Sequence, residues 1–255
     1  MPAIAVPQVN IKSPSLGGRS VTASRAGFLH NYFYFFMSLL IGVLVVYGFS
    51  RTVDKNLIHP AVRRPFLLYI HAVVFGGWVV FYMLQSTLVR TRNVGLHRRI
   101  GWFGAALGVV IPVLGISTAI TMSRFNMVQL HQTGAAAFLM VPLFDIFAFS
   151  VPFALGIYWR KKPELHRRLL LVASCALTAA AFGRFPPNIL PPVVFYAGVD
   201  SLIVLGLARD LIVNRRVHPV YLYALPAFIV GQTVVMYTVV HNLPYWLKIA
   251  DALLR

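Results

Sequence analysis

Long, unbroken apolar runs are the feature of this sequence that most restricts its fold. They recur along the chain and show neither the alternation of a barrel strand nor the one-sided stripe of a soluble helix. A run of about 20 apolar residues matches the hydrocarbon thickness of a bilayer at about 1.5 Å per residue. Because backbone groups in that layer must be bonded internally, such runs predict transmembrane helices.

Seven spans are predicted, with short connections and no soluble domain between them. Their bounds are residues 30–50, 66–89, 100–122, 127–159, 165–185, 193–213 and 220–241. The long fourth span contains Pro142 and Pro152, which predict a kink or a tilt. The fold class is therefore all-α, a polytopic helix bundle in residues 30–255. Residues 1–29 read as an irregular basic tail, and without an apolar h-region they do not resemble a cleavable signal peptide.

The charge balance indicates which surfaces the chain meets. The net charge is +17, yet only 11% of residues are charged, against about 25% in soluble domains. The basic residues occupy short connections between apolar runs, a pattern that excludes nucleic-acid binding and favours contact with the bilayer and its anionic lipids.

The side of the membrane on which each connection lies follows from the same residues. Most basic residues lie in the tail and in the connections after the second, fourth and sixth spans; the connection after the first span is the discordant one. This bias places the N-terminus in the cytoplasm and the C-terminus on the periplasmic or extracellular side of the cell's inner membrane.

A weak internal repeat links two pairs of spans. The third span begins with Leu-His-Arg-Arg-Ile at 96–100, and the fifth begins with Leu-His-Arg-Arg-Leu at 165–169. The second and third spans thus echo the fourth and fifth. Because both pairs start on the same side, they are predicted to be parallel repeats.

Four histidines are distributed by side and by helix. His71 and His131 fall toward the outer face on the second and fourth spans, and His97 and His166 toward the inner face on the third and fifth. Such an arrangement is typical of a bundle that holds two b-type haems, each with two imidazole ligands. The neighbouring arginines are candidates for pairing with haem propionates; they are Arg98, Arg99, Arg167 and Arg168.

The same histidines also have an alternative, purely structural interpretation that involves no haem. A His-Arg-Arg sequence at the start of a span is also an interfacial anchor, with the arginines among headgroups. His131 depends on where the fourth span begins, and histidines at one membrane face equally suit copper.

The acidic residues Asp145 and Asp200 fall well inside predicted spans. A carboxylate there costs about 2.5–3.5 kcal/mol on insertion scales, so each should face a partner or a polar cavity. Asp145 lies on nearly the same helix face as His131 and either contributes to a proton path or bonds a neighbouring helix. Arg184 is the expected ion-pair partner of Asp200.

Two stretches of the chain carry a resemblance to known proteins. Residues 69–101, from Tyr-Ile-His to Leu-His-Arg-Arg-Ile-Gly, and residues 142–169, from Pro-Leu-Phe-Asp to Leu-His-Arg-Arg-Leu, resemble the signatures of a group of uncharacterised bacterial multi-pass membrane proteins. That resemblance implies a fold and no activity. In histidine placement alone the chain is similar to cytochrome b561-type proteins, which implies His71 with His131 and His97 with His166 as ligand pairs.

Three functions are consistent with these patterns. The leading hypothesis is a membrane electron carrier with haem b, with His71 and His131 as the first ligands to test. The second is a non-catalytic subunit or assembly factor that packs against other membrane subunits. The third is a transporter of protons or small solutes that uses Asp145 and Asp200. No hydrolase or nucleotide-dependent motif occurs.

Overall fold

The computed structural model describes the backbone of residues 18–255 and the side chains of residues 27–255, and all regular elements there are helical. Residues 1–17 of the predicted tail lie outside the described residues. The elements in chain order are α1 (Gly18–Ser50), the π-helical turn η1 (Asp54–Ile58), α2 (Phe66–Arg90), α3 (Val94–Val128), α4 (Ala135–Phe138), α5 (Met140–Tyr158), α6 (Pro163–Ala176), α7 (Ala179–Phe182), the 3₁₀ turn η2 (Pro192–Val194), α8 (Tyr196–Asn214), α9 (Pro219–Val240) and α10 (Pro244–Leu254).

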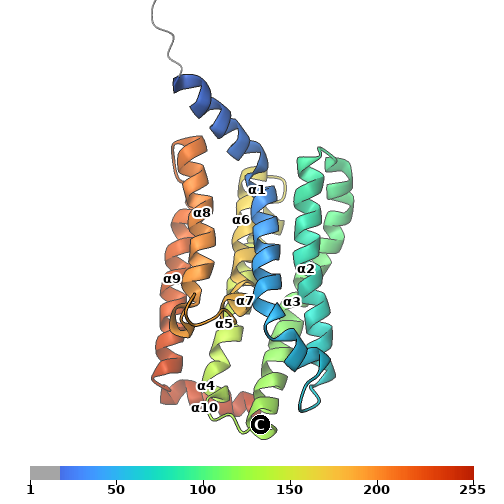
Figure 1. Ribbon diagram of the computed structural model, residues 1–255, viewed down its shortest axis with the longest axis vertical. Coiled ribbons are helices and arrows are strands. Elements are labelled where there is room, and N and C mark those ends of the chain that lie inside the picture. Colours follow the sequence, from blue (N-terminus) through green and yellow to red (C-terminus); the bar gives the residue numbers. More distant parts are fainter. Residues whose placement is uncertain (1–17) are drawn as a thin grey trace, which may run out of the picture.

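Within residues 18–255 the helices form seven long passes. These passes run side by side and alternate in direction (Figure 1). The α2–α3, α5–α6 and α8–α9 connections lie at one end of the bundle, which we call the upper end after its place in Figure 1. The α3–α4 connection and α10 form the lower end, and η1 and the α7–α8 connection with η2 lie in the lower half of the bundle (Figure 1). The three connections predicted to share a side therefore do so.

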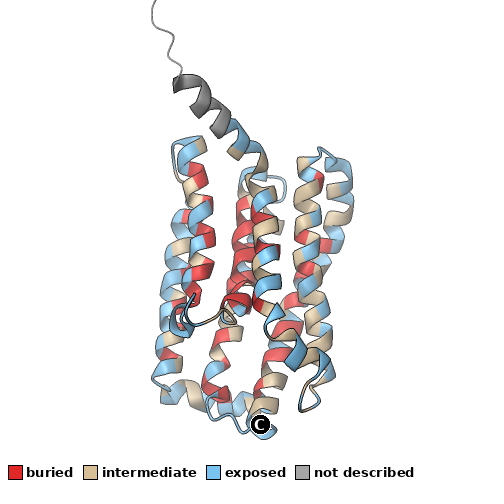
Figure 2. Cartoon of the chain, in the orientation of Figure 1, coloured by how far each residue is buried: buried red, intermediate tan, exposed pale blue. Residues whose placement is uncertain are grey.

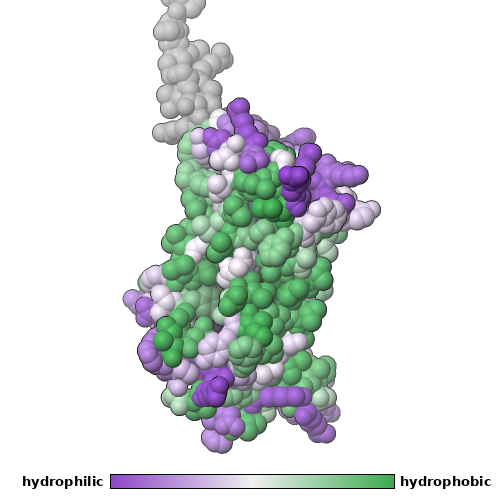
Figure 3. All heavy atoms as spheres, turned by 90° about the vertical axis from the view of Figure 1, so that its right-hand side faces the viewer, coloured by the Kyte–Doolittle hydropathy of each residue, from purple (hydrophilic) through white to green (hydrophobic). Residues whose placement is uncertain are grey.

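Among the described residues, six passes are long and apolar enough to cross a membrane. The seventh, α8, is 19 residues long and is less apolar because it contains three charged residues, Asp200, Arg209 and Asp210. It nevertheless lies alongside α9 from the upper end of the bundle downward (Figure 1). One face of the molecule shows a broad hydrophobic middle with hydrophilic residues gathered at both ends (Figure 3). The chain is an integral membrane protein with an all-helical bundle, as its sequence predicts.

The core is centred on α6. From Arg168 to Ala176 every residue except Leu170 is buried, and the buried positions concentrate there in Figure 2. Valines and other large apolar side chains on the outer faces remain exposed, including Val46, Val73 and Val113 at 70%, 74% and 67%. Exposed apolar side chains on the outer faces are expected where lipid, rather than water, surrounds the helices.

The two predicted repeats are two helical hairpins, α2–α3 and α4/α5–α6, each starting at the lower end and turning at the upper end. Asn93 caps α3 by accepting a hydrogen bond from the Leu96 N–H, whereas α6 begins with Pro163 at its first position. Both are regular helix starts, so the two Leu-His-Arg-Arg sequences occupy equivalent places.

Several bounds differ from the predicted ones for local reasons. The first helix begins at Gly18 rather than at residue 30, and the third extends to Val128 rather than to 122. The fourth span is divided at Leu139, three residues before Pro142; a proline lacks the N–H that would bond the carbonyl four residues earlier, which explains the predicted irregularity.

An additional helix, α10, follows the seventh pass and lies against α4 and the end of α3. The indole Nε1 of Trp246 donates to the Ala137 carbonyl at 3.0 Å, and Arg124 donates to the carbonyls of Leu254 and Leu253 at 3.0 and 3.1 Å. These bonds cover the lower end of the bundle with the C-terminal segment.

Candidate functional site

The two inner histidines come together at the upper end. His97 and His166 each occupy the fourth position of a helix, α3 and α6, and their ring centres are 6.4 Å apart with an interplanar angle of 75°. Two passes of chain separate these histidines in the sequence. Their rings come together because the α2–α3 and α5–α6 hairpins pack side by side. Of the predicted histidine pairs, this is the one whose rings are in contact.

A backbone carbonyl orients one of these rings. The Nδ1 of His166 lies 2.9 Å from the carbonyl oxygen of Gly156, to which it donates a hydrogen bond. In a neutral imidazole this bond leaves the lone pair on Nε2, the usual arrangement for a ligating histidine. The Nδ1 of His97 is buried and has no hydrogen-bond partner among residues 27–255.

Further unsatisfied polar atoms lie beside His97. Both amide atoms of Gln85, on α2, are buried without a hydrogen-bond partner in the described part of the chain. Gly101 is one helical turn after His97, and the nearest atom that a Cβ there would meet is the Gln85 amide nitrogen at 4.0 Å. Buried polar groups are rarely left unpaired, so His97 and Gln85 together indicate that a ligand or water belongs here.

The arginines predicted to pair with propionates have different environments. Arg98 and Arg99 are exposed on α3. Arg168 is 1% exposed and all of its donors bind carboxylates. Its Nε and Nη2 donate to the two carboxylate oxygens of Asp210 at 2.8 and 2.7 Å, and its Nη1 donates to Glu164. Arg167 pairs with the same Glu164 at 2.5 Å. Arg168 therefore has no donor left for a propionate.

The outer histidines are not joined in this way. His71 lies on α2 with its ring stacked on Phe75, at 3.9 Å between ring centres. His131 falls in the α3–α4 connection, exposed and with φ of 51°, because α3 ends later and α4 begins later than predicted. No ring contact or hydrogen bond links these two histidines in residues 27–255.

The two intramembrane acids bond neutral donors. Tyr196 donates to Asp145 at 2.8 Å, and the Gln232 amide donates to Asp200 at 3.0 Å. The expected ion pair between Asp200 and Arg184 is not among those formed by the described residues; Arg184 donates to the Ala180 carbonyl and lies over the Phe49 ring. The orientation of Arg184 along its own helix end explains the difference.

A buried ion network at the upper end was not predicted from the sequence. Asp210 accepts from Arg168 on α6, from Arg209 at 2.8 Å and from Asn214 at 3.1 Å. Arg209 and Asp210 are 2% and 0% exposed. The signal that could have revealed the network is an acid followed within one turn by the end of an apolar span, since such a carboxylate needs a cation from a neighbouring helix.

The next connection packs close to this network. His218 caps α9 by accepting the Val220 N–H at its Nδ1, 3.2 Å away. Burial lowers the pKa of the His218 imidazole, and the positive charge of Arg168 acts in the same direction. Both effects favour the neutral form that can accept the bond.

Neither a protein-family model nor a curated protein nor a solved structure matches the chain. The assignment of function therefore depends on the geometry described above.

Proposed function

We propose that the protein is a membrane electron carrier that binds the iron of a b-type haem between His97 and His166. The observation that supports it is the 6.4 Å separation of the two ring centres. Bonds of about 2.0 Å from a metal to each imidazole nitrogen place two such ring centres about 6 Å apart. A metal bonded to one nitrogen of each ring would therefore be consistent with the separation of the two ring centres.

The surrounding residues suit a flat ligand at this place. Gly101 leaves the α3 surface beside His97 open, and the Gln85 amide offers both a donor and an acceptor. Arg98 and Arg99 lie next to His97 and are free of ion pairs among the described residues, so they remain the candidates for propionates.

The protein's own groups would set the properties of such a centre. The Gly156 carbonyl fixes the tautomer of His166 and raises the basicity of its Nε2. Two imidazole ligands saturate iron, so a bound haem would supply one-electron transfer without substrate binding at the metal. The positive-inside bias supports a cytoplasmic position in the cell's inner membrane for the upper end and for this proposed centre.

The test is an absorption spectrum of the purified protein, oxidised and reduced, after expression with ample haem. We expect sharp reduced bands of a six-coordinate b-type haem that both His97→Ala and His166→Ala abolish. His241→Ala, an exposed lower-end histidine, is the matched control and should keep the bands.

Variants of the outer histidines decide between one haem and two. If His71→Ala and His131→Ala leave the spectrum unchanged, the inner pair holds the only haem. A spectrum without haem bands would exclude haem binding, and metal analysis of the same sample would then show whether copper occupies the pair.

Transport of protons is a second candidate, favoured by Asp145. Its carboxyl lies within an apolar span and is bonded by the Tyr196 hydroxyl rather than by a cation, an environment in which an acid can take up and release a proton. A proton flux in vesicles that Asp145→Asn abolishes, with folding intact, would support transport over electron transfer.

A further inference from the structure

The buried part of the ion network has one more positive charge than negative. Arg168, Arg209 and Asp210 are each 2% exposed or less, so two guanidinium groups share one buried carboxylate. The partly exposed pair of Arg167 and Glu164 adds one charge of each sign and leaves the excess unchanged. A buried charge without a counter-charge is costly, and a bound anion would remove that cost.

Arg209 also has hydrogen-bond donors without an acceptor. Its Nη1 donates to Asp210, whereas its Nε and Nη2 are buried and have no hydrogen-bond partner in residues 27–255. The guanidinium carbon lies 5.6 Å from the centre of the Tyr34 ring. The face of that ring attracts a cation but offers no oxygen to an N–H group. Two nitrogens of Arg209 therefore lack an acceptor within the described part of the chain.

Two tyrosine hydroxyls from neighbouring helices extend this group of donors. The Tyr221 hydroxyl, from α9, lies 2.5 Å from the place that a Cβ of Gly206 would take, and Gly206 is one helical turn before Arg209 on α8. The Tyr34 hydroxyl, from α1, is near both Tyr221 and Arg209. Both hydroxyl oxygens are buried, and neither has a hydrogen-bond partner of normal geometry among the described residues. Donors from α1, α8 and α9 therefore meet at one place.

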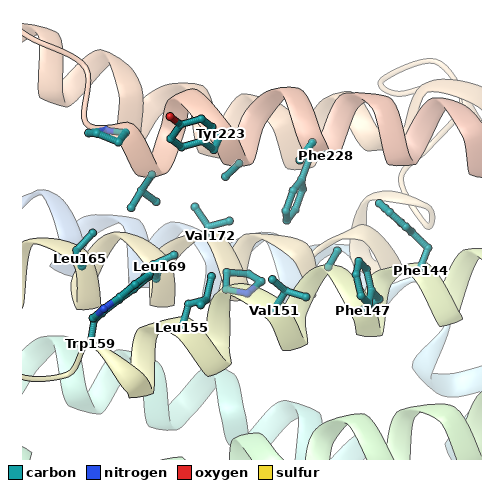
Figure 4. A pocket seen from close by; sticks show the side chains of 16 residues that line it. Phe144, Phe147, Val151, Leu155, Trp159, Leu165, Leu169, Val172, Tyr223 and Phe228 are labelled. Carbon is teal, nitrogen blue, oxygen red and sulfur yellow. The ribbon is translucent and has the colours of Figure 1, made fainter.

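The surroundings of these donors restrict the size of a ligand. Arg209 is 2% exposed and Tyr221 0%. The apolar groove of about 460 Å³ between α5 and α9 is lined by other residues, among them Tyr223 and Phe228 of α9, and by none of the three donor residues (Figure 4). A ligand with an acyl chain or another large group is thereby excluded, which leaves a small ion or a water molecule.

We infer that Arg209, Tyr34 and Tyr221 bind one small monovalent anion of the halide class, such as chloride. The ion accepts hydrogen bonds from Nε and Nη2 of Arg209 and from the two hydroxyls. Its single negative charge balances the excess of one, whereas a divalent anion would reverse the sign of the buried charge. A water molecule would accept the same bonds but would leave the charge uncompensated.

Binding of radioactive chloride to the purified, detergent-solubilised protein tests the inference. We expect saturable binding of one ion per chain, which bromide displaces and gluconate at equal ionic strength does not. Because an ion that binds only the folded protein stabilises it, saturating chloride should also raise the unfolding midpoint by roughly 5 °C over gluconate.

Variants with matched controls locate the ion. Arg209→Gln removes the excess charge and should abolish chloride binding. Arg216→Gln removes the same charge from the exposed connection after α8 and should leave chloride binding unchanged.

Two further variants keep the test decisive if Arg209→Gln does not fold. Tyr34→Phe and Tyr221→Phe keep all charges, and each should weaken chloride affinity about tenfold, as for one hydrogen bond to a charged group. Tyr223→Phe changes an exposed tyrosine of α9 that lines the apolar groove instead, and its chloride affinity should equal that of wild type.

The opposite results are equally specific. Wild-type protein without saturable chloride binding would overturn the inference and assign the donors to water. Wild-type affinity in both Tyr34→Phe and Tyr221→Phe would overturn it too, because the ion would then lie elsewhere. Tighter binding of sulfate than of chloride would contradict the monovalent assignment. None of these measurements depends on haem.

Discussion

Arg168 of α6 holds both carboxylate oxygens of Asp210 of α8, at 2.8 and 2.7 Å, with both side chains withdrawn from solvent and lipid. Such a bidentate pair is the strongest geometry available to these groups. The pair joins the α5–α6 hairpin to the α8–α9 hairpin at the upper end of the bundle.

Removing one partner of this pair should be severely destabilising. Asp210→Asn leaves Arg168 and Arg209 buried without their shared counter-charge, and we expect a loss of about 3–5 kcal/mol in the free energy of unfolding. Reversible unfolding in mixed detergent micelles measures it. The triple variant Arg168→Met, Arg209→Met and Asp210→Leu removes all three buried charges and should recover much of the loss. Arg167→Gln, at the half-exposed pair with Glu164, should cost less than about 1 kcal/mol.

Filling the space beside His97 should block haem without removing a ligand. Gly101→Leu places a branched side chain where only the Gln85 amide is near, so we expect haem content to fall at least tenfold while the helical circular dichroism stays unchanged. Gly76→Leu, on the exposed side of α2 with nothing within 4 Å, is the control. Full haem content in Gly101→Leu would mean that the macrocycle does not lie there.

Close packing between the two hairpins requires Gly108. A Cβ at this position would lie 2.1 Å from the Phe153 ring, deep between α3 and α5. Gly108→Ala should therefore destabilise the bundle by about 1–3 kcal/mol through overpacking. Thermal unfolding in detergent checks this, with Gly76→Ala as the neutral comparison; a Gly108→Ala protein as stable as wild type would show that the hairpins can separate without loss.

The bond between Tyr196 and Asp145 should contribute only modestly to stability. Double-mutant cycles for side-chain bonds between membrane helices average about 0.6 kcal/mol and reach about 1.7. A cycle of Tyr196→Phe and Asp145→Asn should give a coupling in that range. A coupling above about 3 kcal/mol would indicate that Asp145 carries a charge that Tyr196 alone stabilises.

The cap of α9 should make stability depend on pH. Because burial lowers the pKa of His218, its imidazole takes up a proton more readily in the unfolded chain than in the folded one. The contribution of the neutral cap is thus complete above about pH 6.5 and declines as the pH falls. His218→Ser keeps an acceptor that does not titrate, and its unfolding midpoint should change less than that of wild type between pH 7 and pH 5.

The sequence predicts the number and course of the passes because lipid imposes one simple rule, a long apolar run for each crossing. His97 and His166 could be paired in advance because the predicted topology places both toward the inner face, at the starts of two helices, and the structure brings their rings together. The bounds were less accurate: α3 continues past its apolar stretch to Val128, which leaves His131 in a connection.

Side-chain partners were harder to predict than passes. Asp200 accepts a hydrogen bond from Gln232 of α9 rather than from Arg184. The prediction considered only oppositely charged partners, so it did not include an uncharged amide on a facing helix. Arg168 reads as a headgroup anchor in its Leu-His-Arg-Arg sequence, and only the position of α8 shows that it is a core residue.

The bidentate pair has a consequence for how the protein is made. The translocon handles helices in chain order, and α8 enters with charges that its own apolar residues do not fully offset. Until α8 lies beside α6, Arg168 has no carboxylate from another helix to neutralise it. The buried pair is therefore complete only when the sixth pass reaches the fifth, because a chain that stops before Asp210 lacks the carboxylate that Arg168 holds by both oxygens.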